Sequence, residues 1–111
     1  MALSNIIQLS EFDVTQKIIE SLSNVCTRAV LFSVKKESKD ATQIAEELKL
    51  SISTVYKTLS ALEDLGLIEV HKFIFSSEGK KIKKYRSRIG KVEITLDNPE
   101  PILHLHPNKK P

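Results

Sequence analysis

Apolar residues recur at helical spacing through the N-terminal part of the 111-residue chain. A polar residue stands in front of each apolar segment, where a Ser, Asp or Asn oxygen can accept hydrogen bonds from the free amides of the first helical turn. Spacing and caps together predict four helices. They are expected over about residues 13–23, 25–36, 41–48 and 52–65, with caps at Asp13, Asn24, Asp40 and Ser51.

The third and fourth predicted helices are joined only by Lys49, Leu50 and Ser51. Two helices joined by so short a turn form a helix-turn-helix. The second predicted helix is apolar on almost every side, which is typical of a helix buried by several neighbours. The sequence therefore predicts a helical unit with the second helix at its centre. Gly66 is expected to end the fourth helix in the left-handed conformation.

After Gly66 the apolar period changes from helical to alternating, which predicts β-strands. Three strands are expected, over about residues 67–75, 82–89 and 92–96, with turns at residues 76–79 and at Gly90. Four prolines follow, and proline excludes a helix interior. They are Pro99, Pro101, Pro107 and Pro111. The predicted fold class is α+β, with a single domain over residues 1–97 and an extended, proline-rich tail over residues 98–111.

Charge is concentrated in one part of the chain. Residues 71–91 contain eight basic residues and one acidic residue, whereas residues 1–70 contain seven basic and ten acidic residues. The basic segment coincides with the first two predicted strands and the turn between them. A solvated, lysine-rich loop would explain such a run. It is also the pattern expected of a surface that contacts phosphates.

Helices followed by a basic β-hairpin form a winged helix-turn-helix layout, and the sequence itself resembles a family with that layout. The matching segments are TQIAEEL (residues 42–48), STVYKTL (residues 53–59) and LEDLGLI (residues 62–68). They are similar to winged-helix transcriptional regulators of the ArsR type, especially compact prokaryotic and archaeal members, over about residues 25–89. The resemblance implies regulation of transcription by binding double-stranded DNA. Related regulators often carry a basic residue after the capping serine, where this chain has Ile52.

The fourth predicted helix has two distinct sides. Val55, Leu59 and Leu62 fall on one side at 100° per residue, whereas Ser53, Lys57 and Ser60 fall opposite, flanked by Thr54 and Tyr56. Small hydrogen-bonding side chains near a helix N-terminus fit insertion into the major groove. The free amides there can also receive a phosphate.

The hairpin would be the wing, over about residues 76–86, with lysines and arginines that reach the DNA backbone or the minor groove. We expect the wing to strengthen binding to every sequence and the helix to set sequence preference. The candidate DNA-binding residues are Ser51, Ser53, Thr54, Tyr56, Lys57, Ser60, Lys80, Lys81, Lys83, Lys84, Arg86 and Arg88.

Catalysis, cofactors and membrane insertion find no support in the sequence. The chain has three glycines and no glycine-rich phosphate loop, and no Ser-His-Asp set or paired carboxylates can be discerned. One cysteine excludes an intrachain disulfide. No stretch of eighteen apolar residues or signal peptide is evident, so a cytoplasmic location without membrane contact is expected. We predict a protein that is not an enzyme and binds no cofactor.

A metal site is not predicted, although two features deserve weighing. His104 and His106 alternate by two, so a strand would place both imidazoles on one face. Cys26 lies near the start of a predicted buried helix, where a cysteine is usually part of the core. A metal- or thiol-responsive DNA-binding switch is therefore an alternative, as is a winged-helix adaptor that binds protein instead of DNA.

A homodimer is expected, because one recognition helix reads few base pairs. Two apolar surfaces are candidates for the dimer contact, and either could instead be internal core. They are Ile18, Ile19 and Leu22 of the first predicted helix, and Val92, Ile94 and Leu96 of the third predicted strand.

Overall fold

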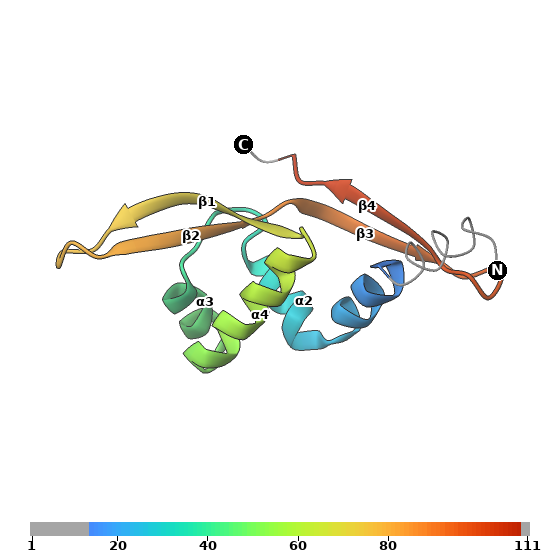
Figure 1. The fold of residues 1–111 in the computed structure, drawn as a ribbon, viewed down its shortest axis with the longest axis horizontal. Helices are drawn as coiled ribbons and strands as arrows, with labels where there is room; N and C mark the ends of the chain where they lie inside the picture. The colour runs from blue at the N-terminus through green and yellow to red at the C-terminus, as the bar shows by residue number, and fades with distance from the viewer. Residues whose placement is uncertain (1–13, 110–111) are drawn as a thin grey trace, which may run out of the picture.

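The computed structural model describes residues 14–109, and their fold is α+β (Figure 1). Residues 14–23 are helical and precede three further helices and four strands. These are α2 (Val25–Ser33), α3 (Ala41–Leu48), α4 (Ile52–Asp64), β1 (Ile68–Phe75), β2 (Lys81–Ser87), β3 (Ile89–Thr95) and β4 (Ile102–Pro107). The α2 helix ends three residues earlier than expected, because Val34 leaves the helical conformation and acts as its C-cap.

The helix boundaries follow from local hydrogen bonds. The side chains of Asn24, Asp40 and Ser51 each accept a hydrogen bond from the backbone amide three residues later, as predicted. Asp40 and Gln43 complete a reciprocal capping box, which fixes the start of α3. Asp13, the fourth predicted cap, lies outside the described residues. Gly66 follows α4 with φ +75°, the left-handed conformation expected of it.

A single apolar core joins the helices to the base of the first hairpin. Residues of α2, α3 and α4 are fully enclosed, and Ile18 and Leu22 of the first helix join them, so these two are core residues. The enclosed residues of α2–α4 are Val30, Leu31, Ile44, Val55, Leu59 and Leu62. The α2 helix is buried on one side only, because Val25 is 71% exposed and Phe32 39% exposed. The expectation of a helix buried all round was wrong in this respect.

Strands β1 and β2 form an antiparallel hairpin, the wing, which spans residues 68–87. Its register runs from Ile68 opposite Ser87 to Phe75 opposite Lys81, with a bulge near the base. Lys39, in the loop between α2 and α3, exchanges two backbone hydrogen bonds with Tyr85 of β2. This bridge ties the hairpin to the helix-turn-helix, which completes the winged-helix arrangement.

Strands β3 and β4 form a second antiparallel hairpin. Gly90 lies inside β3 and not in a turn, and a Cβ there would stand 3.2 Å from the carbonyl oxygen of Pro107. Glycine therefore permits a close approach of the two strands. The segment expected to be an extended tail contributes β4, because the pairing partner of residues 102–107 is β3.

The two hairpins project toward opposite ends of the molecule, with the helices between and beneath them (Figure 1). The principal extents are 58 × 28 × 26 Å, so the hairpins account for the elongated shape. Within residues 14–109, no helix is long and apolar enough to cross a membrane.

Candidate nucleic-acid interface

The α4 helix presents one polar, exposed face. Val55, Leu59 and Leu62 are buried against the core, which leaves the opposite side in solvent. Tyr56 is 56% exposed and Ile52 43% exposed. The exposed candidate residues on this helix are Ser53, Thr54, Tyr56, Lys57 and Ser60. The face therefore combines hydroxyl groups, one lysine and an aromatic ring, with Ile52 free to meet a partner instead of packing inward.

Three hydroxyl groups cluster where α4 begins. Ser51 Oγ accepts a hydrogen bond from the Thr54 amide at 3.2 Å and donates to Thr54 Oγ1 at 2.7 Å. Ser53 Oγ lies 3.3 Å from Ser51 Oγ. The Ser51 hydroxyl is thus engaged in capping, so its first role is to fix the helix start. The neighbouring hydroxyls of Ser53 and Thr54 are held in position beside the free amides of the first turn.

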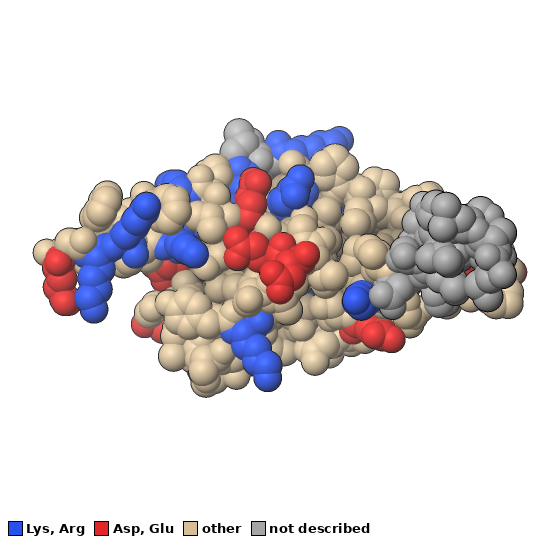
Figure 2. Space-filling model, in the orientation of Figure 1, with Lys and Arg blue, Asp and Glu red and all other residues tan. Residues whose placement is uncertain are grey.

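The tip of the wing is a tight turn stabilised by hydrogen bonds from and to Ser76. The amides of Gly79 and Lys80 donate to its carbonyl oxygen and to its Oγ, at 2.9 and 3.0 Å. Gly79 has φ +82°, a conformation that glycine adopts without strain. Lys80, Lys81 and Lys83 are exposed beside this turn. Figure 2 shows Lys and Arg side chains along the projecting hairpin, with acidic side chains both at its tip and over the centre of the molecule.

Two further basic candidates, Lys84 and Arg88, have partners in the protein. Lys84 Nζ donates a hydrogen bond to Gln43 Oε1 at 2.7 Å, which links the wing to α3. Arg88 Nη1 lies 3.4 Å from the carbonyl oxygen of Gly66, at the C-terminal end of α4 and away from the hydroxyl cluster.

Arg86 is only 7% exposed, so it does not share the surface of the lysines as the sequence led us to expect. Three consecutive residues of β2, Tyr85 to Ser87, are buried. At this level the strand lies against both β1 and the loop after α2, since the amide of Ser87 donates to the carbonyl oxygen of Val34. The alternation of residues along a strand cannot show that both of its faces are covered. The assignment of Arg86 to the exposed DNA-binding surface is therefore corrected.

Tyr85 connects the base of the wing electrostatically to α4. Burial raises the pKa of the Tyr85 phenol, and the nearby Glu63 and Tyr56 raise it further. The neutral phenol of Tyr85 is therefore favoured. Tyr85 lies where the wing meets the loop after α2 and α4. Any displacement of the wing would disturb this packing.

The histidines of β4 face an acidic residue of β3. His104 and His106 share one face, as alternation predicts, and His106 Nε2 lies 2.6 Å from Glu93 Oε1. This hydrogen bond lowers the pKa of Glu93, and Lys91 contributes further. Cys26 is half-buried in α2. Within residues 14–109, no three potential ligands are placed to hold a metal ion.

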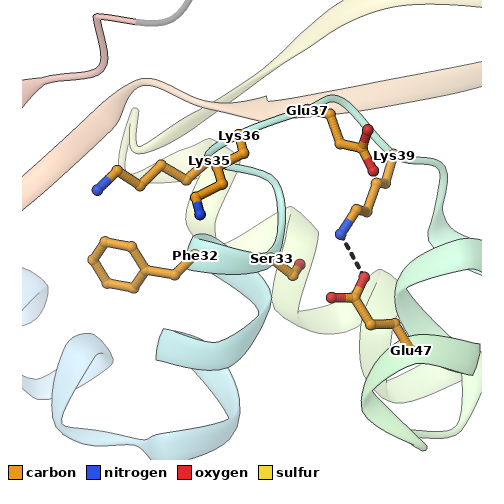
Figure 3. Close-up of a pocket in the computed structure, with 7 residues that line it drawn as sticks. All are labelled: Phe32, Ser33, Lys35, Lys36, Glu37, Lys39 and Glu47. Carbon is orange, nitrogen blue, oxygen red and sulfur yellow. Dashed lines mark hydrogen bonds and ion pairs between the residues drawn. The ribbon is translucent and has the colours of Figure 1, made fainter.

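Two hollows lie away from α4. One, of about 480 Å³, lies between the end of α2, the following loop and α3 (Figure 3). Its basic side chains, Lys35, Lys36 and Lys39, alternate with Glu37 and Glu47, and Lys39 pairs with Glu47 across it. Because side chains of both signs line this hollow, their charge does not indicate which class of ligand would bind there. The other, of about 350 Å³, is an apolar groove between the first helix, α2 and β3, lined in part by Ile19, Leu22, Phe32, Val92 and Ile94.

Comparison with known proteins identifies the family. Residues 29–87, from α2 to the end of β2, match the family described as sugar-specific transcriptional regulator TrmB. The chain is 37% identical over 68 residues to an HTH-type transcriptional regulator of Methanocaldococcus jannaschii, MJ0229, which is itself uncharacterized. That match covers 61% of this chain and 72% of the relative.

A solved structure, Lactococcus lactis ZitR in an apo, mutant form, is also similar, with a TM-score of 0.47 and 24% identity. The match covers 78% of this chain, which spans 62% of the length of that protein. The family match and the relative MJ0229 confirm the resemblance read from the sequence as far as a transcriptional regulator is concerned, whereas the matching family is TrmB and not the ArsR type. The chain belongs to the TrmB family of transcriptional regulators.

Proposed function

We propose that this DNA-binding regulator recognises specific sequences by placing α4 in the major groove and the wing on the flanking backbone. One observation carries the proposal: the exposed face of α4 bears hydroxyls, Tyr56 and Lys57, while the adjoining hairpin bears exposed lysines. Groups that hydrogen-bond to base edges specify sequence, whereas charges on phosphates position the protein. The two surfaces supply these two functions separately.

The proposed contact surface is smaller than the sequence suggested. On α4 it comprises Ser53, Thr54, Tyr56, Lys57 and Ser60, with Ser51 as the cap that orients them. On the wing it comprises Lys80, Lys81 and Lys83, with Lys84 held by Gln43 at its edge. Arg86 is left out because it is buried, and Arg88 because its guanidinium lies beside Gly66.

The protein would bind as a homodimer, since one helix reads too few base pairs for useful discrimination in a genome. The apolar groove supports a contact between two copies, because Ile19, Val92 and Ile94 line it and Ile94 remains 44% exposed. Ile18 and Leu22, the other candidates on the first helix, are already buried within one chain. We further infer a regulator without catalytic activity that acts in the cytoplasm, where the DNA of a prokaryotic cell is accessible.

Fluorescence anisotropy with mixed-sequence duplex DNA of about 30 base pairs, repeated at rising salt, tests the proposal. Three phosphate contacts per subunit predict a slope of about −2.7 for log affinity against log salt concentration, and a dimer would double it. A selection for preferred sites should then recover a sequence with two related halves. Absence of binding even at low salt would contradict the proposal and favour a winged-helix adaptor that binds protein.

A further inference from the structure

The outer half of the wing exposes two phenylalanines on one face. Phe73 is 46% exposed and Phe75 72% exposed, and one residue separates them along β1. Lys83 lies directly opposite Phe73, and Lys81 opposite Phe75. Since paired residues of antiparallel strands share a face, aromatic rings and ammonium groups alternate on this surface.

This face continues the side of β2 on which Tyr85 is buried. Lys81, Lys83 and Tyr85 occupy alternate positions of β2, so they point to the same side of the strand. Tyr85 is buried in the core, whereas the two lysines lie farther out, beyond the part of the hairpin that the helices cover. The aromatic and basic surface is therefore on the side of β2 to which Tyr85 points, whereas Lys84, at the alternate position, reaches Gln43 of α3.

The two phenylalanines have different surroundings. Lys81 Nζ lies 4.0 Å from the centroid of the Phe73 ring, a cation–π contact that holds the ammonium group over that ring. Within residues 14–109, no such contact involves Phe75, the last residue of β1 before the turn. A large apolar side chain this exposed, on a face that also carries Lys81 and Lys83, is typical of a binding surface.

The charges on this surface indicate the class of partner. Lys81 lies opposite Phe75 and Lys83 opposite Phe73, and these two lysines outweigh Glu78 in the adjoining turn, so a polyanion is favoured. The ring requires a flat, apolar surface within that polyanion. Stacked bases between two phosphate backbones supply both features. Phenylalanine is among the side chains that enter the minor groove as wedges between base pairs.

We propose that Phe75 inserts between base pairs in the minor groove beside the site occupied by α4, with Lys81 and Lys83 on the neighbouring phosphates. This inference rests on the proposed function and adds a second element of specificity to it. Pyrimidine–purine steps such as TA and CA unstack most easily. Phe75 would therefore favour such a step at the flank of the site without forming a hydrogen bond to any base.

A single tryptophan can report this contact directly, because the chain contains none. In a Phe75→Trp variant, stacking of the indole against bases quenches its fluorescence when duplex DNA is added. The matched control is Val25→Trp, at an exposed site of α2 outside the wing and outside the apolar groove. We expect quenching at position 75 and unchanged emission at position 25 when duplex DNA is bound.

Alanine variants separate stacking from charge. Phe75→Ala should weaken binding about tenfold at every salt concentration, because aromatic contact with a base is lost while the number of phosphate contacts is unchanged. Phe73→Ala, on the same face, should have a smaller effect that varies with salt, since it releases the ammonium group of Lys81. Circular dichroism confirms that the variants are folded.

The outcomes distinguish this inference from the proposed function. If Phe75→Trp binds duplex DNA without quenching, the wedge is overturned while DNA binding stands. If the quenching is stronger and the binding tighter with single-stranded DNA of the same sequence, Phe75 stacks on unpaired bases and the duplex wedge is overturned. If neither wild type nor variant binds duplex DNA, the proposed function itself fails, and the wedge fails with it.

Discussion

The two hairpins share a construction and differ in what surrounds them. Each is an antiparallel pair of strands with a bulge near one end, between Val70 and Lys72 in the wing and between Ile89 and Lys91 in the β3–β4 hairpin. They project in opposite directions from the helices (Figure 1). Residues 68–87 contain six basic and two acidic residues, whereas residues 89–107 contain one basic and three acidic residues.

Their apolar residues are also placed differently. In the β3–β4 hairpin, Ile89 is buried and Val92 and Leu103 pack against the core. In the outer wing, Phe73 and Phe75 are exposed among lysines. The same backbone architecture therefore exposes different side chains: the wing exposes aromatic rings among lysines, whereas the β3–β4 hairpin packs on the core at its base and exposes aliphatic side chains such as Ile94 farther out. The following variants test that difference.

The largest expected effect is on salt-dependent DNA binding. Replacing Lys80, Lys81 and Lys83 together by alanine removes three phosphate contacts. Each contact adds about 0.9 to the slope of log affinity against log salt concentration. For the three contacts of one subunit, raising the salt from about 50 to about 200 mM should therefore weaken DNA binding by the wild type about 40-fold more than binding by the variant. Lys91→Ala in the other hairpin is the control and should match the wild type. Equal slopes in all three proteins would end the distinction between the hairpins.

The next effect concerns association of two copies. Ile94→Lys places a charge in the apolar groove beside β3, and a buried unpaired charge is costly. Gel filtration should show the mass of a dimer for the wild type and a mass near 12.5 kDa for the variant. Val25→Lys, at an exposed site of α2 outside the groove, should remain dimeric. Elution of the wild type itself as a single chain would contradict the dimer.

The glycines of the two hairpins should differ in how they tolerate alanine. Gly90→Ala brings a Cβ within 3.2 Å of the Pro107 carbonyl oxygen, and we expect a loss of about 1 kcal/mol in the free energy of unfolding. Gly79→Ala meets no atom within 4 Å but must adopt φ +82°, which costs about 1 kcal/mol.

Substitution by asparagine separates the effect of a steric contact from the effect of a left-handed backbone, because asparagine tolerates the left-handed conformation. Gly79→Asn should recover part of the loss, whereas Gly90→Asn should be at least as unstable as Gly90→Ala. Urea denaturation measures each value. Recovery by asparagine at position 90 instead would show that conformation, and not contact, requires that glycine.

The smallest effect is a pH dependence in the β3–β4 hairpin. The hydrogen bond from His106 lowers the pKa of Glu93 below its ordinary value of 4.5, so the folded state holds the ionised form more strongly than the unfolded chain does. This contribution is present above pH 4.5 and is lost as the pH falls through the folded-state pKa. Glu93→Gln should melt slightly below the wild type near neutral pH and converge with it in acid. A constant difference across the range would contradict this account.

The helical half of the fold was predictable because its signals are local. Caps such as Asp40 with Gln43, and the spacing of Val55, Leu59 and Leu62, determine where helices begin and which side is buried. The pairing of residues 102–107 with β3 was missed because it joins segments through a contact that no local pattern encodes. Gly90 was likewise assigned to a turn, although it lies inside β3, where the absence of a side chain lets β4 approach closely.

The composition of the candidate site was predictable only in part. The basic run marked the wing correctly as a charged hairpin, but the sequence could not show that Arg86 is enclosed on both faces or that Lys84 bonds to Gln43. Phe73 and Phe75 were not singled out. Their signal was present as two aromatic residues at strand spacing, and it acquired meaning only once the register placed lysines opposite them.

The most direct test of the central claim is the ratio of affinities for a selected site and a scrambled duplex. It should be measured at one salt concentration for the wild type, for Lys57→Ala on α4, and for the triple lysine variant of the wing. We predict that Lys57→Ala lowers this ratio, while the wing variant weakens both affinities and leaves the ratio unchanged. A ratio that falls with the wing variant and is unaffected by Lys57→Ala would contradict the assignment of base readout to α4 and of phosphate contacts to the wing lysines.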